Sequence, residues 1–404
     1  MSPSLPYPIQ RRSLALVTAL AVALVGVVGV SAPPTVEAAC GSFQNRVNKA
    51  APGSRIKIPK CTYRESVVIS KPLTIDAYGV TIDARGAQHG LLIQANDVTV
   101  NGVTVTNASG GDHHGAVQVN SASRFTLRRA KVHDSATVCL TLNGGAGHRI
   151  IKSNLMRCGK EGYFGNGISK TKFIGNWIHH NNTDLKWDPQ VEAGGGKIMA
   201  SRGITFAWNK VWANGGPGIW FDTGVRNVVV KKNRVWNNHE SGIMFEISNG
   251  ARILGNKVWG NGFGHAAWGF GAGILISSSD NAKIRYNTVA WNARGISVIS
   301  QKRPTKPHKG NVISDNVIIS DTGRFVTGFY DDHGGSLFYG ANGNRGYDNR
   351  YWIGASQPSG ERFHWKGPRT TLAAYNQTRG EQRGRYISTT KRNAILRSKN
   401  MPIR

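Results

Sequence analysis

Apolar and polar residues alternate in short stretches along most of the chain, and these stretches recur with a long period. The clearest part runs from Asn209 to Ser300, where four segments share one formula. Each segment has an Asn, an apolar pair, a second Asn, and then Gly-Ile or Gly-containing alternation, as in NKVWANGGPGIWFDTG and NRVWNNHESGIMFEISNG. Alternation with a period of two is typical of strands, and a repeat of about 20–50 residues indicates a solenoid.

Two series of asparagines mark fixed points in each repeat. The first series is Asn154, Asn176, Asn209, Asn233, Asn256, Asn287 and Asn316. The second follows five residues later in most copies, at Asn181, Asn214, Asn238, Asn261 and Asn292. Because Asn tolerates left-handed backbone and hydrogen-bonds its own chain, two such series are expected at two corners of every coil. The pattern predicts a parallel β-helix.

Short strands, stacked Asn corners and coils of this length resemble the secreted right-handed parallel β-helix proteins of the pectate-lyase-like superfamily. The resemblance covers residues 54–325. It implies an all-β, single-stranded right-handed parallel β-helix with a short N-terminal helical cap and a C-terminal cap of strands and helix. The superfamily includes polysaccharide lyases, glycoside hydrolases, uronan epimerases, phage tailspikes and non-enzymatic adhesins, so the resemblance specifies fold more closely than activity.

The ends of the chain differ from the repeats. Arg11 and Arg12 precede an apolar run from Leu14 to Val30 and small residues before Ala39, a pattern that predicts a secretory signal peptide over residues 1–38. No later run matches it, so a secreted, extracellular monomer without a transmembrane segment is expected. The remaining boundaries are placed at 39–62 for the N-terminal cap, 63–325 for the β-helix, and 326–404 for a C-terminal capping region with a basic tail.

Four cysteines allow three disulfide connectivities, and export permits disulfides. The sequential pairing, Cys40 with Cys61 and Cys139 with Cys158, is favoured. Cys40 precedes a short amphipathic stretch that begins after Ser42, and Cys61 closes the first strand after it. In the resemblance, this segment corresponds to the helical cap over the first coil. The two later cysteines are 19 residues apart, slightly less than one coil, which suits neighbouring coils.

Strand alternation also predicts which side chains leave the core. With Ile219 and Phe221 pointing inward, Trp220 and Asp222 point outward. Applied to each coil, this phase gives one outward column of Asn120, Asn143, Asn166, Lys197, Asp222, Glu246 and Ser277. Two carboxylates on successive coils beside an ammonium are a pattern suited to acid–base chemistry or to a divalent ion. The alternative is a surface ladder in which Lys197 neutralises Asp222.

Lys197, Asp222 and Glu246 are therefore the candidate catalytic residues. In a lyase, Lys197 would abstract the proton, and Asp222 and Glu246 would hold a cation such as Ca²⁺ on the substrate carboxylate. In a glycoside hydrolase, the two carboxyl groups would flank the glycosidic bond. Two insertions, TDLKWDPQVEAGGGK and GFGHAAWGFG, are expected to form walls around a groove over these residues. The candidate substrate-binding residues are Trp220, Trp187, Glu192, Asn166, Met244 and His239.

A second outward column contains His179, Trp212, Trp236 and Trp259, three residues after successive frame asparagines. Stacked indoles could hold sugar rings, or the C-terminal segment could cover them; cover by this segment is the favoured interpretation.

The net charge of +29 falls to +28 after removal of residues 1–38, which hold two Arg and one Glu. Such a charge favours polyanionic partners, here an acidic polysaccharide or a cell-wall polyanion. No phosphate-binding loop is present, so a nucleotide cofactor is not expected. Three functions are consistent with the sequence: a lyase cleaving a uronic-acid-type polysaccharide by β-elimination, a glycoside hydrolase, and a non-catalytic cell-surface glycan-binding protein. An epimerase is not separated from these by the sequence.

Overall fold

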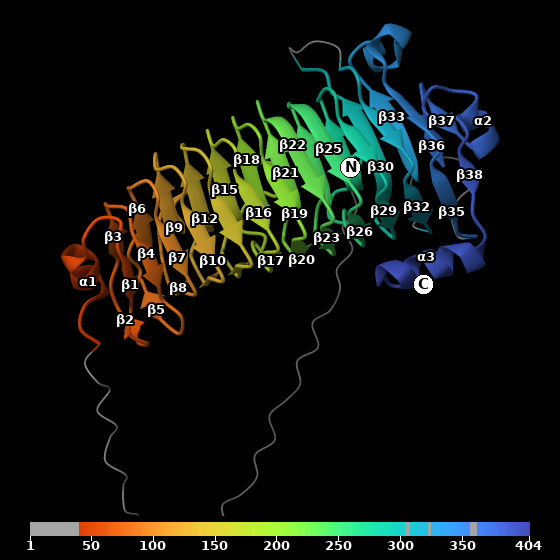
Figure 1. Cartoon of the computed structure of the whole chain (residues 1–404). Coiled ribbons are helices and arrows are strands. Elements are labelled where there is room, and N and C mark those ends of the chain that lie inside the picture. Colours follow the sequence, from red (N-terminus) through yellow and green to blue (C-terminus); the bar gives the residue numbers. More distant parts are fainter. Residues whose placement is uncertain (1–39, 304–307, 322–324, 356–361) are drawn as a thin grey trace, which may run out of the picture. The chain divides into compact units, whose positions relative to one another are not determined.

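Each coil of the chain forms three short strands, and equivalent strands of successive coils pair into three long sheets (Figure 1). The computed structural model describes residues 40–303, 308–321, 325–355 and 362–404. The expected signal peptide, residues 1–38, lies outside the described residues. In the described part of the chain, no helix is long and apolar enough to cross a membrane.

Sheets A and B have twelve and thirteen strands, respectively. Sheet A is built from β1 (Arg55–Lys57), β4 (Thr74–Asp76), β7 (Thr99–Asn101), β10 (Thr126–Arg128), β13 (Arg149–Ile151), β16 (Lys172–Ile174), β19 (Thr205–Ala207), β22 (Arg226–Lys231), β25 (Asn249–Leu254), β28 (Lys283–Arg285), β31 (Val312–Ser314) and β34 (Arg345–Tyr347). Sheet B is built from β2 (Thr62–Tyr63), β5 (Thr81–Asp83), β8 (Thr104–Thr106), β11 (Lys131–His133), β14 (Asn154–Met156), β17 (Trp177–His179), β20 (Lys210–Trp212), β23 (Arg234–Trp236), β26 (Lys257–Trp259), β29 (Thr288–Ala290), β32 (Val317–Ser320), β35 (Arg350–Ile353) and β38 (Arg385–Tyr386).

Sheet C has thirteen strands and contains the longest one, of seven residues. Its strands are β3 (Val67–Ile69), β6 (Leu91–Ile93), β9 (Gly115–Asn120), β12 (Val138–Asn143), β15 (Glu161–Asn166), β18 (Gly194–Met199), β21 (Ile219–Asp222), β24 (Ile243–Glu246), β27 (Ala272–Ser277), β30 (Arg294–Ser300), β33 (Thr327–Asp331), β36 (Phe363–His364) and β37 (Pro368–Arg369). Pairing is parallel along the sheet up to its last pair, β36 with β37, which is antiparallel. The predicted parallel β-helix is confirmed.

Both Asn corners form continuous hydrogen-bonded ladders. Along the first, each side-chain amide donates to the Asn Oδ1 of the next coil, and six such bonds of 3.0 or 2.9 Å connect Asn176, Asn209, Asn233, Asn256, Asn287, Asn316 and Asn349. Buried amides require partners, and the coil-to-coil spacing supplies them. Asn154 was wrongly placed in this series, because the neighbouring Ser153 donates its backbone N–H to Asn176 instead.

The core between the sheets confirms the predicted inward phase. Ile219 and Phe221 are fully buried, and Phe173 and Phe206 of adjacent coils stack with their ring centroids 4.4 Å apart. Burial of these side chains favours folding, since each coil of a solenoid buries its apolar face only against its neighbours.

The N-terminal cap is helix α1 (Phe43–Lys49). Ser42 Oγ accepts a hydrogen bond from the Asn45 N–H, and Phe43 and Val47 are buried against the first coil. A disulfide joins Cys40 to Cys61, with 6.0 Å between the Cα atoms, and a second joins Cys139 to Cys158, with 5.6 Å. The sequential pairing is confirmed.

The stacked strands extend beyond the boundary expected at Phe325. Strands β33, β34, β35, β36 and β38 each pair with the strand one coil earlier, so coils continue to Tyr386. Long connections hide the period in this region. The 3₁₀ turns η1 (Ser336–Phe338) and η2 (Gly340–Asn342) lie within one of them, and helix α2 (Leu372–Asn376) within another.

The expected basic tail is helix α3 (Thr389–Lys399), which lies against sheet B. Leu396 and Met401 pack with the indoles of Trp236, Trp259 and Trp291, and the Trp291 Nε1–H donates to the Pro402 carbonyl at 2.9 Å. The C-terminal segment therefore covers part of the tryptophan column, as favoured from the sequence.

Candidate active site

The outward face of sheet C holds the candidate catalytic residues, but with a different register at one coil. Lys197 pairs with Trp220, and Met199 is the residue that pairs with Asp222. The predicted column is therefore wrong by two residues at Lys197. The long insertion between β17 and β18 of the same coil leaves two outward positions in β18 that alternation alone does not distinguish.

The Lys197 ammonium nevertheless reaches Asp222, with 2.8 Å between Nζ and Oδ2. It also lies 4.1 Å from the ring centroid of Trp220 and donates to the Val191 carbonyl at 2.8 Å. Lys197 and Asp222 are 6% and 7% exposed, so the pair is enclosed under the first insertion instead of standing on an open face. An ammonium with these three partners is poorly placed to abstract a proton.

Glu246 is ion-paired with a residue that the sequence did not indicate. Arg303 Nη2 lies 2.9 Å from Glu246 Oε1, and the Ser277 hydroxyl donates to the same oxygen at 3.2 Å. Burial, and then the charge of Asp222, raise the pKa of Glu246, while Arg303 opposes this shift.

A cavity of about 160 Å³ lies beside Glu246 on the same face. Its walls come from both insertions, as expected, and its floor contains Trp220 and Met244. The lining residues are Pro189, Gln190, Pro217, Trp220, Glu240, Ser241, Met244, Glu246, His265, Phe270, Gln301 and Arg303. The structure therefore brings Trp220, Met244 and Glu246 together in the predicted groove, whereas Lys197 and Asp222 do not line it.

Glu240 is the second carboxyl group of the cavity. It is 5% exposed, and burial followed by repulsion from Asp188 raises its pKa to about 8. His265 Nδ1 lies 3.8 Å from Glu240 Oε2, and burial lowers the pKa of His265. Glu240 is thus held as a neutral acid at neutral pH. The sequence contains one signal for this residue. Glu240 lies in the segment NNHESG, and the equivalent segment of the preceding coil, NGGPG, has no acidic residue.

Trp187 and Glu192 lie together away from the cavity lining. The fully buried Lys160 places Nζ 2.8 Å from Glu192 Oε1 and 4.6 Å from the Trp187 ring centroid. The same ammonium is ion-paired with Asp112. These contacts attach the first insertion to an earlier coil.

Asn166 and His239 also lie outside the cavity lining. Asn166 pairs with Met199 and is exposed at the end of β15. His239 is half-buried, and its ring comes so close to Gly264 that a Cβ there would lie 2.0 Å from Nε2. His239 therefore packs against Gly264 in the second insertion.

The residues expected to hold Ca²⁺ do not fit that ion as they stand. Asp222 is neutralised by Lys197, and Glu246 by Arg303. Among the described residues, Asp112, His113 and Glu192 have potential ligand atoms within 4.8 Å of one another, but the Lys160 ammonium already bridges both carboxylates.

Comparison with known proteins agrees with the architecture. A family model described as a right-handed β-helix region matches residues 115–272. Similar solved structures include XylC in complex with xylose (TM-score 0.60, 10% identity, 80% of this chain and 82% of that one) and a Dettilon tailspike protein (0.56, 15%, 79% and 62%). The periplasmic alginate epimerase AlgG is also similar (0.52, 14%, 86% and 83%). No curated protein sequence matches the chain. The chain has the right-handed parallel β-helix fold that the pectate-lyase-like proteins share.

Proposed function

We propose that this protein is a secreted carbohydrate-active enzyme that cleaves an acidic polysaccharide in the cavity on sheet C. The observation that carries the proposal is a pair of buried carboxyl groups, Glu240 and Glu246, in one cavity with an aromatic floor. Paired carboxyl groups in different electrostatic environments are how glycosidic bonds are cleaved. The structural similarity to XylC, which was solved with xylose, and to an alginate epimerase supports a carbohydrate ligand.

Hydrolysis is the reaction that the geometry supports best. Glu240, with its pKa of about 8, is protonated at neutral pH and can donate that proton to the glycosidic oxygen as the bond to the anomeric carbon breaks. Glu246, whose ionised form Arg303 favours, acts either as the base that activates a water molecule for attack on that carbon or as the nucleophile that attacks the carbon directly. The Phe270 ring, which lines the cavity, can support the sugar ring.

β-Elimination on a uronic-acid polymer is the second candidate. Arg303 in the cavity and the net charge of +29 favour an acidic substrate. In this reaction Arg303 would bind the uronate carboxylate. The sequence-based role of Lys197 as the base loses support, because its ammonium is enclosed by Asp222, Trp220 and Val191.

Glu240→Gln and Glu246→Gln test the acid–base pair. We expect each to lose at least ~10²-fold in turnover on a uronic-acid polysaccharide that the wild type degrades, the usual scale for one acid or base. Reducing ends and ultraviolet absorbance should be followed together, since only β-elimination leaves an unsaturated product. The same assay with an added chelator tests whether turnover requires Ca²⁺.

Asp184→Asn is the matched control, since Asp184 is an exposed carboxylate on the first insertion and does not line the cavity. It should keep wild-type turnover. Full activity in both glutamine variants would show that the reaction takes place elsewhere, and cleavage of none of the acidic or neutral glycans by wild type would favour a non-catalytic binding protein.

A further inference from the structure

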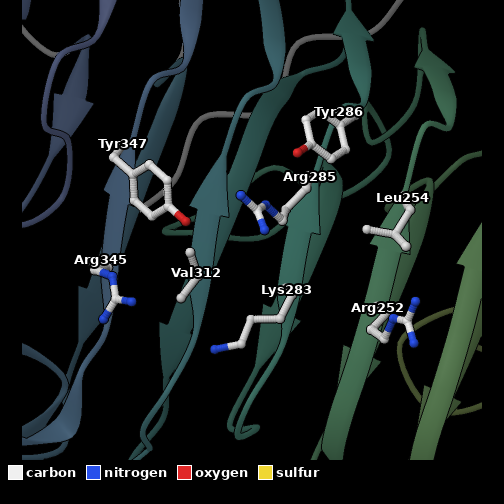
Figure 2. Close-up of a pocket in the computed structure, with 8 residues that line it drawn as sticks. All are labelled: Arg252, Leu254, Lys283, Arg285, Tyr286, Val312, Arg345 and Tyr347. Atoms are coloured by element: carbon white, nitrogen blue, oxygen red, sulfur yellow. The ribbon is translucent and has the colours of Figure 1, made fainter.

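A second concave surface lies on sheet A, separate from the sheet that carries the cavity. We call it the basic groove. It has a volume of about 440 Å³ and is lined by Arg252, Leu254, Lys283, Arg285, Tyr286, Val312, Arg345 and Tyr347 (Figure 2). These residues come from β25, β28, β31 and β34 and from the corner after β28. Four of the eight side chains are cationic, and none is acidic.

Strand register places most of these side chains in two parallel rows along the solenoid axis. One row is Arg252, Lys283, Val312 and Arg345, and the other is Leu254, Arg285, Ser314 and Tyr347. Adjacent members of a row stand one strand spacing apart, ~4.8 Å at the backbone. The groove therefore repeats its chemistry along one direction, a property that suits a linear ligand better than a compact one.

The cations of the groove are only partly compensated by protein groups. Arg285 reaches Asp315 at 3.2 Å, and Lys283 donates to the Gly310 carbonyl at 2.7 Å. Within the described residues, Arg252 and Arg345 have no carboxylate within ion-pair distance, and both are exposed. Burial, followed by repulsion from Arg345 and Arg285, lowers the pKa of Lys283. An anionic ligand would relieve this repulsion.

The remaining groups of the groove suit a sugar polymer. Val312, 3% exposed, forms an apolar floor between the cations. Figure 2 shows the phenol oxygens of Tyr286 and Tyr347 turned toward the groove, where they can hydrogen-bond hydroxyl groups. The Arg285 guanidinium lies 5.4 and 6.0 Å from these two ring centroids, so it occupies space that a stacked nucleobase would need.

We propose that the basic groove is a second binding site, which takes a linear acidic polysaccharide along the solenoid axis and anchors it away from the cavity. With about one sugar per coil, carboxylates of the polymer pair with Arg252 and Lys283 on adjacent coils and with Arg345 two coils further along, and the sugar between them lies over Val312.

Binding of polygalacturonate to the full chain tests the site. The measurement uses the Glu240→Gln background to avoid turnover, and compares this protein with one that also carries Arg252→Ala and Arg345→Ala. We expect the added substitutions to weaken binding at least about tenfold, because charge-assisted hydrogen bonds are lost. The dependence of affinity on salt should also become shallower.

Arg149→Ala with Lys172→Ala is the matched control. These two exposed cations lie in the same row of sheet A, on coils before the groove, and do not line it. This pair should change the affinity by less than about twofold, because both charges are exposed and lie outside the groove. Fully methyl-esterified polygalacturonate is the matched ligand control, and it should bind at least about tenfold more weakly than the free acid.

Three results would overturn the proposal: equal binding after loss of Arg252 and Arg345, equal loss in the control pair, or equal binding of the methyl ester. Tighter binding of single-stranded DNA through the same residues would assign the groove to nucleic acid instead. Failure of the cavity to cleave any glycan leaves these results unaffected, because the groove is tested by binding in a protein without Glu240.

Discussion

Glu240 combines burial with a nearby negative charge, and both favour its neutral form. Asp188, on the first insertion, is the charged group that raises the pKa of Glu240 after burial does. A general acid must be protonated in the free enzyme, so its pKa sets an alkaline limit on kcat/KM. The acid proposed here is therefore sensitive to the charge of the loop above it.

We predict that kcat/KM falls as the pH rises through about 8, where Glu240 loses its proton. Asp188→Asn removes the repulsion and should move this limb to lower pH, while its amide oxygen can still accept the bond from the Gln190 N–H. The measurement is a pH profile of both proteins on the same substrate. An unchanged limb in Asp188→Asn would show that another group sets it.

Glu161 supplies the control for this profile, because its pKa is also raised to about 8, by burial. Its carboxyl oxygens have no hydrogen-bond partner among the described residues. A carboxyl whose folded pKa exceeds its unfolded value binds more protons in the folded state. Stability is therefore lost as pH rises from the unfolded value toward 8. Glu161→Gln should reduce this loss of thermal stability and leave the alkaline limb of kcat/KM in place.

At the scale of single elements, α3 is held by both apolar and polar contacts. Leu396 is fully buried against the tryptophan cluster, and Arg234 donates to the Asn400 carbonyl at 2.8 Å. The indoles of Trp212, Trp236 and Trp259 are stacked face to face, with centroids 4.9 and 5.0 Å apart. Because their faces cover one another, this column presents edges, and it is poorly suited to holding sugar rings.

Leu396→Ala is predicted to loosen α3 without unfolding the coils. Removing a buried Leu side chain typically costs ~2–5 kcal/mol, and that cost falls on the docking of one helix. Amides of residues 389–399 should exchange faster with solvent, with the strands of sheet C unchanged. Arg397→Ala, an exposed change on the same helix, should leave exchange as in wild type. Equal exchange in both variants would mean that the polar contacts alone hold the helix.

The elements that follow from local pattern were predictable, and those that depend on loop paths were not. Asn corners, the inward phase at Phe221 and the α1 cap depend on periods of a few residues that the sequence displays. The register of Lys197 was not predictable, because the insertion before β18 interrupts the count between coils. Glu240, His265 and Arg303 lie in turns and loops, where only the folded path decides which side chains meet at the cavity.

At the scale of the whole molecule, one repeated coil places three different surface features on three different sheets. Sheet C carries the cavity, sheet B carries the stacked indoles under α3, and sheet A carries the basic groove. The sheet in which a residue lies depends only on its position within the coil. Side chains on one face can therefore be substituted without altering the other two faces. Stability, by contrast, is shared along the axis, since each coil is held only by its neighbours.

The Cys40–Cys61 bridge tests this axial coupling. It closes a loop between residues 21 apart, a constraint worth ~3 kcal/mol by chain entropy. In Cys40→Ser with Cys61→Ser, α1 should detach more often, which exposes the first coil, whose strand β1 pairs with β4 on one side only. Hydrogen exchange should then accelerate in β1–β4 and decline toward wild-type values along the axis, with β27 and β30 unaffected.

The matched variant is Cys139→Ser with Cys158→Ser, whose bridge lies between coils that have neighbours on both sides. It should accelerate exchange around β12 and β15 and leave β1 as in wild type. If both pairs instead accelerated exchange uniformly from β1 to β35, the solenoid would unfold as one cooperative unit, and the ends would have no separate stability to lose.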